Sequence, residues 1–322
     1  FMARIVITYG VPAEGFEALA GHEVLIPPPG ERFSHQQLMA LLPTADAVLA
    51  CTALDAGLIA SAPSLRLIVC YGAGYDAIDV AAATRQGVQV ANIPDTVTAS
   101  TAELTVALML ALARDLPGLN ADVRTRPGSD LFVLGQGMHV CLSGAALGVV
   151  GMGRIGTRVA DVGRALGMRI LYTAHAPKPQ REALGDRFLP LDDLLRQSDV
   201  VTLHCPLTAQ TRGLLDARRL ALMKPTAYLI NTARGALVVE EALLDALKTG
   251  RIAGAGLDVY PDEPNVNPAF FGLSNVVLTP HAGSNTHSTR RAMAAAAMDC
   301  IRRALEGREA VSYTHLRAHE TT

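Results

Sequence analysis

The sequence contains no tryptophan, only 4 % of its residues are aromatic, and its formal net charge is −2. It has no basic run, so nothing in the charge pattern favours binding to nucleic acid or to an anionic membrane. The longest apolar run, residues 104–113, is too short to span a bilayer, and we expect no signal peptide ahead of residues 4–7. The five cysteines include no C-x-x-C pair. Most of them lie in apolar segments, where we expect small buried side chains, and a reducing cytoplasm fits this use of cysteine.

The stretch LGVVGMGRIG, residues 147–156, combines a strand pattern with three glycines. Its first four residues are apolar, as in a buried parallel strand, and G-x-G-x-x-G follows at Gly151, Gly153 and Gly156. In a dinucleotide-binding fold these glycines allow a tight turn, close approach of the backbone to a pyrophosphate, and close packing of the helix. The next segment is apolar at helical spacing and ends at Gly167. This order predicts a phosphate-binding turn between a strand and a helix.

Strand and helix patterns alternate through the first part of the chain. The predicted strands are residues 4–8, 23–26, 47–50, 65–70 and 88–90, and the predicted helices are residues 13–20, 34–42, 55–61 and 78–85. Such alternation is typical of a parallel sheet with helices on both faces. No glycine triplet follows the opening strand, so we do not expect this part to bind the nucleotide.

The second part of the chain repeats the alternation around the glycine motif. Ser100 and Glu103 form a capping-box pattern, which predicts the start of a buried apolar helix over residues 101–114. Residues 115–137 are interpreted as an extended excursion, and residues 312–322 as a disordered or non-native tail. Together with the glycine strand, the predicted strands 169–172, 200–204, 227–231, 254–259 and 276–279 give six. The predicted helices are residues 191–197, 217–223, 240–249 and 289–305.

Polar residues follow three of these strands, at the edge where ligands bind in open α/β sheets. Arg234 follows the strand 227–231, and its planar group suits a carboxylate or carbonyl oxygen. Asp258 and Glu263 follow the next strand, and His281 follows the last one. A histidine near a carboxylate and an arginine suits proton transfer coupled to hydride transfer. The alternatives are a surface arginine that caps a helix, a solvated acidic turn, and a structural histidine.

These motifs together resemble the D-isomer-specific 2-hydroxyacid dehydrogenases, nearly throughout the chain up to residue 311. Besides LGVVGMGRIG, the segments that carry the resemblance are YGAGYDAIDV (71–80), ANIPD (91–95), VTLHCPLTAQT (201–211), INTARGALVVEEAL (230–243), AGLDVYPDEP (255–264) and LTPHAGSNT (278–286). The family often has a tryptophan in the excursion before the glycine strand. This chain has none, and Phe132 is the nearest substitute.

The resemblance implies roles for individual residues. Arg234 would bind and polarise the 2-oxo acid, His281 would donate the proton, and Glu263 would hold the histidine protonated. The backbone N–H groups of Ala73 and Gly74 would bind the substrate carboxylate. The residues expected at the cofactor are Gly151, Gly153, Arg154, Ile155, Gly156, His175, Lys178, Pro206, Thr211, Thr232 and, on the nicotinamide side, Asp258.

The second strand of the predicted nucleotide fold lacks the usual acid. An NAD-specific fold places Asp or Glu about 20 residues past the glycines to bind the ribose 2′-OH, whereas residues 162–181 contain no acidic residue. Ala174 stands in its place, followed by His175, Lys178 and Arg181, which could attract the 2′-phosphate of NADP. The alternative is that Lys178 and Arg181 point into water. The pattern resembles the NADP-using glyoxylate/hydroxypyruvate reductase branch, although an arginine often stands at the position of His175.

The resemblance implies an α/β fold of two doubly wound parallel-sheet domains with a cleft between them. The expected domains are a flavodoxin-like substrate domain, residues 1–98 plus 286–322, and a Rossmann-type dinucleotide-binding domain, residues 99–285. We expect a cytoplasmic homodimer that reduces a small 2-oxo acid, such as glyoxylate or hydroxypyruvate, to the D-2-hydroxy acid. We expect NADP to be the preferred cofactor and NAD to be the alternative, and we expect no metal. The alternatives are a dinucleotide-sensing corepressor, a phosphoglycerate dehydrogenase and, less favoured, formate or phosphite oxidation.

Overall fold

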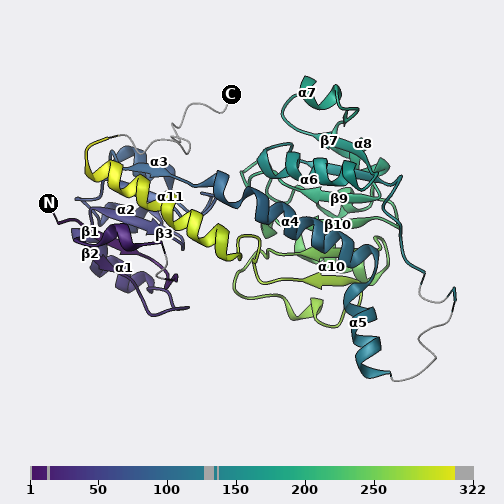
Figure 1. Cartoon of the computed structure of the whole chain (residues 1–322), viewed down its shortest axis with the longest axis horizontal. Coiled ribbons are helices and arrows are strands. Elements are labelled where there is room, and N and C mark those ends of the chain that lie inside the picture. Colours follow the sequence, from purple (N-terminus) through teal and green to yellow (C-terminus); the bar gives the residue numbers. More distant parts are fainter. Residues whose placement is uncertain (1, 13–14, 127–133, 136–137, 309–322) are drawn as a thin grey trace. The chain divides into compact units, whose positions relative to one another are not determined.

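The computed structural model describes residues 2–12, 15–126, 134–135 and 138–308 (Figure 1). The chain divides into two compact units. Unit 1 is Phe1–Val97 with Asn285–Thr322, and unit 2 is Thr98–Ser284. Two interpretations of the sequence lie outside the described residues. They are Phe132 in place of the family's tryptophan, and the tail at residues 312–322.

Unit 1 contains a five-stranded parallel sheet in the order β2-β1-β3-β4-β5. Its strands are β1 (Arg4–Ile7), β2 (Glu23–Leu25), β3 (Ala47–Ala50), β4 (Leu67–Cys70) and β5 (Gln89–Ala91). The order 2-1-3-4-5 is that of the flavodoxin-like doubly wound fold. The central strands β3 and β4 are buried at every residue, as the uninterrupted apolar sequence requires for a sheet covered on both faces.

Helices cover both faces of the unit 1 sheet. The helices are α1 (His35–Leu41), α2 (Ala56–Ala60), α3 (Val80–Arg85) and α11 (His287–Leu305), with short 3-10 helices at η1 (Glu17–Leu19) and η2 (Leu42–Thr44). One core cluster joins the sheet to α11, and the other joins it to the first three helices. A helix was expected over residues 13–20, and in the described part of this range, residues 15–20, the structure has only the 3-10 helix η1. Gly15 and Gly21, at φ 93° and 96°, adopt a conformation that no α-helix contains.

Unit 2 contains a seven-stranded parallel sheet in the order β12-β11-β10-β9-β6-β7-β8. Its strands are β6 (Ala146–Val150), β7 (Arg169–Thr173), β8 (Arg187–Phe188), β9 (Val200–Leu203), β10 (Tyr228–Asn231), β11 (Gly254–Leu257) and β12 (Val276–Leu278). The order reverses between β6 and β9, which is the switch point where a Rossmann sheet binds its ligand. The two sheets confirm the predicted fold class. The prediction of six strands was one too few, because β8 has only two residues and no pattern of its own.

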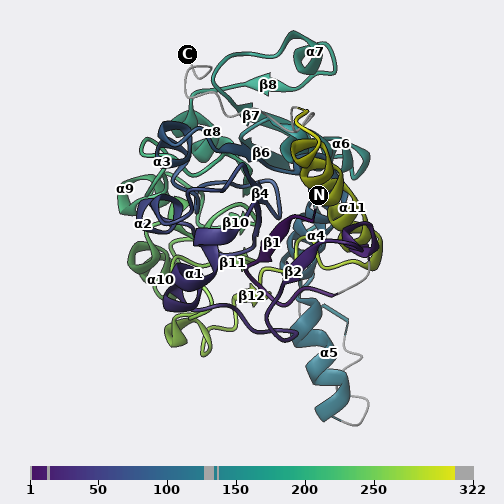
Figure 2. The same ribbon diagram turned by 90° about the vertical axis from the view of Figure 1, so that its left-hand side faces the viewer.

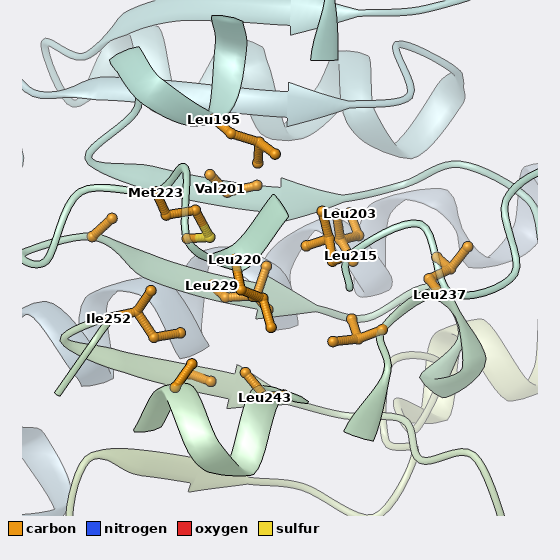
Figure 3. Packing of buried hydrophobic residues seen from close by; sticks show 14 of the residues in the cluster. Leu195, Val201, Leu203, Leu215, Leu220, Met223, Leu229, Leu237, Leu243 and Ile252 are labelled. Carbon is orange, nitrogen blue, oxygen red and sulfur yellow. The ribbon is translucent and has the colours of Figure 1, made fainter. Parts of the chain in front are cut away.

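Helices lie on both faces of this second sheet as well. The remaining described helices of the chain are α4 (Pro94–Ala113), α5 (Leu116–Thr125), α6 (Arg154–Ala165), α7 (Pro179–Glu182), α8 (Leu191–Gln197), α9 (Ala217–Leu220) and α10 (Glu240–Lys248), with 3-10 helices η4 (Gly235–Leu237) and η5 (Pro268–Phe270). Buried side chains of α4 and α6 pack on one face. Those of α8, α9 and α10 pack on the other, where Figure 3 shows leucines from the helices meeting the strands.

Helix α4 begins six residues before the predicted capping box, so the predicted start was wrong. Pro94 opens the helix, where its missing N–H costs nothing, and Asp95 adds an acid to the first turn. Among the described helices, α4 alone has the length and composition to cross a membrane. It also packs as a core helix does. A Cβ placed on Gly256 of β11 would lie 3.1 Å from the Cβ of Leu108, so the helix lies directly on the sheet.

Residues 115–125 were expected to be extended, but residues 116–125 form helix α5. Asp115 caps this helix by accepting a hydrogen bond from the Gly118 N–H, and Pro117 falls in the first turn, where proline is tolerated. The helix has no buried residue, and in Figures 1 and 2 it stands away from the sheet of its own unit. Proline and glycine therefore mark a helix start here, not an irregular excursion.

Candidate active site and cofactor site

The three motif glycines differ in what surrounds them. Gly151 has φ 97°, and a Cβ on it would lie 2.6 Å from the backbone N of Cys205, after β9. A Cβ on Gly156 would lie 2.1 Å from the carbonyl oxygen of Gly151. At Gly153, however, a Cβ would meet nothing within 4 Å. The first and third glycines thus close the strand–helix turn, and the second leaves open space at the start of α6. This arrangement fits a pyrophosphate.

The segment after β7 carries the residues that were expected to determine the preference for NADP over NAD. His175 and Lys178 are exposed, and Ala174 is partly buried. Lys178 is the N-cap residue of α7, and its backbone N–H donates a hydrogen bond of 2.6 Å to the hydroxyl of the buried Tyr172. No acidic residue lies between β7 and α7 that would repel a 2′-phosphate.

Arg181 does not belong to this exposed set, and its predicted contact with a 2′-phosphate was wrong. Its residue exposure is 7 %. Its Nη1 donates to Asp161 at 2.7 Å, and its Nε donates to Asp186 at 2.7 Å. Arg164 pairs with the same two carboxylates. Two acids engage this guanidinium, so it holds the structure together and is not available to a ligand.

The loops after β9 and β10 fix their proposed cofactor residues by local hydrogen bonds. The hydroxyl of Thr211 donates to the carbonyl oxygen of Pro206 at 2.6 Å, which closes a tight loop at the switch point. The hydroxyl of Thr232 lies 2.7 Å from that of Thr105, so the β10 loop is bonded to α4. Arg154 and Ile155 are the first residues of α6, directly after Gly153.

The loop after β10 also carries Arg234, and the side chain of Asn231 fixes the backbone of this residue. The side chain of Asn231 donates to the carbonyl oxygen of Arg234 and accepts from the N–H of Ala233. Gly235 lies against the β11 loop, because a Cβ there would be 2.1 Å from the carbonyl carbon of Tyr260. The Arg234 guanidinium donates to the carbonyl oxygen of Ala233. Its charge also helps to lower the pKa of Glu263, in the loop after β11.

Asp258 holds the loop that carries His281. Its carboxylate is 1 % exposed and accepts hydrogen bonds from the Thr279 hydroxyl and from the N–H groups of Ala282 and Gly283, at 2.6, 2.7 and 3.0 Å. Its carbonyl oxygen also accepts from the His281 N–H. These four hydrogen bonds make Asp258 the anchor of this loop.

His281 and Glu263 form a close pair. The Nδ1 atom of His281 lies 2.7 Å from Oε2 of Glu263, whose Oε1 accepts the N–H of Tyr260 at 3.0 Å. Burial alone would raise the pKa of Glu263, but the hydrogen bond and charge of His281, the Tyr260 N–H and the charge of Arg234 bring that pKa below 4.5. His281 has φ 52°, an uncommon conformation for a residue other than glycine. The loop thus aims a half-exposed imidazole whose Nδ1 already has a carboxylate partner.

Ala73 and Gly74 lie in unit 1, in the loop after β4. Both are partly exposed, and the side chain of Asn92 donates to the carbonyl oxygen of Ala73 at 2.6 Å. Within the described residues, neither of their N–H groups donates a hydrogen bond. Two backbone donors in one turn are a suitable site for a carboxylate.

Sequence reasoning gave no role to three residues that shape the site. Asn231 fixes the arginine loop, Thr279 bonds to Asp258, and the Tyr260 hydroxyl donates to the carbonyl oxygens of Leu257 and Thr279. Burial raises the pKa of Tyr260 to about 12, so its hydroxyl remains a donor. Each is a polar residue at a strand end, which is the signal that could have identified them. The described residues contain no group of three His, Cys, Asp or Glu that could hold a metal ion.

Comparison with known proteins places this site in a family. Residues 106–283 match the family model of the D-isomer specific 2-hydroxyacid dehydrogenase NAD binding domain. The chain is 43 % identical over 304 residues to a glyoxylate reductase from Thermococcus kodakarensis, covering 90 % of each protein. It resembles an NADPH-dependent glyoxylate/hydroxypyruvate reductase from Sinorhizobium meliloti, solved with NADP and malonate (30 % identity, TM-score 0.84, 98 % and 97 % covered). A D-lactate dehydrogenase from Aquifex aeolicus with NAD and lactic acid is also similar (29 % identity, TM-score 0.81, 94 % and 96 % covered).

A nicotinamide dinucleotide-binding fold with a histidine–carboxylate pair at its ligand-binding edge defines a class of oxidoreductases. The chain belongs to the D-isomer specific 2-hydroxyacid dehydrogenase family, which confirms the resemblance. It is an oxidoreductase that reduces 2-oxo acids to D-2-hydroxy acids, and the comparisons do not favour the corepressor or phosphoglycerate dehydrogenase alternatives.

Proposed function

We propose that the chain reduces glyoxylate and hydroxypyruvate with NADPH, using His281 as the proton donor. The observation that carries this proposal is the pair between His281 and Glu263 at the carboxyl edge of a dinucleotide-binding sheet. The substrate class is supported by the similarity to a glyoxylate reductase from Thermococcus kodakarensis and to a glyoxylate/hydroxypyruvate reductase from Sinorhizobium meliloti. In this proposal unit 1 binds substrate, and unit 2 binds the dinucleotide.

The proposed mechanism assigns one task to each residue. The bound nicotinamide supplies the hydride. Arg234 binds the carboxylate or carbonyl oxygen of the substrate through its planar group, and the N–H groups of Ala73 and Gly74 bind the carboxylate. Because Nδ1 of His281 is engaged by Glu263, Nε2 is the nitrogen that carries the proton to the developing alkoxide. Glu263 stabilises the imidazolium before transfer.

The preference for NADP over NAD is the second part of the proposal. Ala174 removes the acid that would repel the 2′-phosphate, and His175 and Lys178 are exposed beside it. One charge-assisted contact contributes about 1.5–3 kcal/mol, and about 1.4 kcal/mol is tenfold in affinity. Salt screening weakens exposed contacts. We therefore expect a 2′-phosphate preference of roughly 10- to 10³-fold.

The proposal also covers the oligomeric state and the cellular location of the protein. We infer a homodimer, supported by exposed apolar side chains on α5: Leu116, Leu119 and Val123 are 53 %, 41 % and 68 % exposed. A cytoplasmic location is supported by the cysteines, which are free thiols.

A panel of 2-oxo acids assayed with NADPH and with NADH, at one ionic strength, tests substrate and cofactor together. The expected result is the highest kcat/KM on glyoxylate or hydroxypyruvate, with NADPH preferred. Ala174→Asp should shift the preference toward NADH, because it restores the carboxylate that binds a 2′-OH and repels a 2′-phosphate. A wild-type ratio below one would overturn the NADP preference. Activity on pyruvate alone would overturn the substrate assignment.

A further inference from the structure

We propose that Tyr172 is a positioning residue for cofactor selectivity. Its buried hydroxyl fixes the main chain of Lys178 and so places the Lys178 ammonium for the 2′-phosphate of NADP. The inference rests on the proposed preference for NADP. In this inference Tyr172 does not contact the cofactor itself, but it fixes the position of Lys178, which does.

One hydroxyl serves both backbone groups of Lys178. The Lys178 N–H donates to the Tyr172 oxygen at 2.6 Å, and the Tyr172 hydroxyl lies 3.5 Å from the Lys178 carbonyl oxygen. Lys178 stands between Pro177 and Pro179, which carry no N–H of their own. Its N–H is therefore the only backbone donor in this three-residue stretch, and it is directed back to the end of β7.

The tyrosine itself is held firmly in the core. It is 0 % exposed, and its ring meets Phe188 of β8 edge to face, with centroids 5.6 Å apart and an interplanar angle of 66°. Phenylalanine would fill the same space and keep this ring contact. The hydroxyl of Tyr172 therefore provides what the ring alone cannot, a hydrogen-bond acceptor for the Lys178 N–H.

A second anchor lies three residues further along the chain. Arg181 of α7 bonds to Asp186 and to Asp161, and Asp161 belongs to α6, the helix that begins at the glycine turn. The segment that carries Lys178 is therefore tied to β7 at its entry and to α6 at its exit. Both ties lead to elements that border the proposed phosphate site.

Fixing the backbone matters because lysine is a long, flexible side chain. Ordering such a side chain on binding costs conformational entropy. If the backbone is already fixed, only the entropy of the side chain is lost when the phosphate binds. The Lys178 side chain is exposed while its backbone is tied to a buried phenol. Loss of the hydroxyl should therefore weaken contacts to the 2′-phosphate and leave contacts to the rest of the dinucleotide unchanged.

The test is calorimetric binding of two fragments, adenosine 2′,5′-bisphosphate and 5′-AMP, to wild type and Tyr172→Phe. The fragments differ only in the 2′-phosphate, so their Kd ratio reports on that group without any turnover. One neutral hydrogen bond predicts that the variant's Kd for the bisphosphate rises about 2- to 10-fold. The Kd for 5′-AMP should change by less than about twofold. Tyr228→Phe, which also removes a hydroxyl from a tyrosine of unit 2, is the matched control and should leave both values unchanged.

A double-mutant cycle with Lys178→Ala separates positioning from general stability. If Tyr172 acts through Lys178, Tyr172→Phe should add less than about twofold to the bisphosphate Kd once Lys178 is alanine. Additive effects, an unchanged bisphosphate Kd, or equal losses for both fragments would overturn the inference while the NADP preference stands. A wild type that binds the bisphosphate no better than 5′-AMP would overturn the NADP preference itself, and the inference with it.

Discussion

At the scale of single residues, the account depends on the hydrogen bond between Glu263 and His281. The pKa of Glu263 is below its usual value, so its carboxylate is ionised throughout the neutral range and loses its charge as the pH falls through that lowered value. Glu263→Gln removes the charge and keeps the shape. The alkaline limb of the pH profile for reduction should move to lower pH, because the imidazolium loses its stabilising partner. An unmoved limb in kcat/KM would show that the pair is not part of catalysis.

Arg234→Lys tests the planar two-point contact with the substrate. Lysine keeps the charge but presents a single point, so we expect kcat/KM for the 2-oxo acid to fall by about 10- to 100-fold, from the loss of about 1.5–3 kcal/mol. Cofactor affinity, measured by fluorescence titration of NADPH, should stay within twofold of the wild-type value. Arg218→Lys, an exposed arginine on α9, serves as the control. Wild-type kinetics in Arg234→Lys would show that Arg234 does not bind the substrate through a two-point contact.

Among single residues, the sequence predicted that Glu263 and His281 lie close together, but it did not predict which cations after β7 are exposed. The pair between Glu263 and His281 follows from two strand ends of one sheet. Arg181 looked equivalent to Lys178, yet the fold surrounds it with Asp161 and Asp186. These carboxylates lie 20 and 5 residues away in sequence. Their convergence depends on how α6, α7 and β8 pack, which no local pattern contains.

At the scale of elements, the loop after β12 is the part that Asp258 holds in place. Asp258→Asn would put an amide N–H₂ where a carboxylate oxygen now accepts, leaving donors in residues 279–283 without partners. We expect a loss of about 1–3 kcal/mol in the free energy of unfolding and a lower kcat, because His281 is no longer held at φ 52°. Urea unfolding and steady-state kinetics measure the two effects. Asp262→Asn, on an exposed neighbour, should change stability by less than about 0.5 kcal/mol, and equal effects in both variants would contradict the anchoring role.

Element types were predicted well where the apolar period was strong, and poorly at helix starts. The buried strands β3, β4 and β6 have uninterrupted apolar sequences, and each was predicted. Helix α4 begins at a proline and α5 includes one in its first turn, so local rules placed a later cap and a loop there. Proline both ends and begins helices, and only the surrounding packing decides between the two.

At the scale of the whole molecule, helix α5 is the feature that predicts assembly. Leu116, Leu119 and Val123 repeat at i, i+3 and i+7, so they share one face of an otherwise exposed helix. The double variant Leu116→Glu/Val123→Glu should convert the proposed dimer to monomer in sedimentation velocity. Arg124→Ala, on the same helix, should leave the dimer intact. A monomeric wild type, or a dimer that survives the charged variant, would contradict this assignment.

The order of strands in both sheets follows from connection rules that the sequence already obeys. Alternating strands and helices permit few topologies, and the two observed orders are the common doubly wound ones. Which acid is reduced and which dinucleotide is used depend on a handful of side chains instead. Those choices therefore need measurement.

The most direct measurement compares wild type with His281→Ala in the reduction of glyoxylate by NADPH, with the Kd for NADPH determined in parallel. The account predicts that kcat falls by roughly 10²–10⁴-fold, because the proton donor is gone. The NADPH Kd should stay within about twofold, because the glycine turn and the α6 N-terminus are untouched. A variant that keeps a kcat within twofold of wild type would contradict the central claim that His281 delivers the proton.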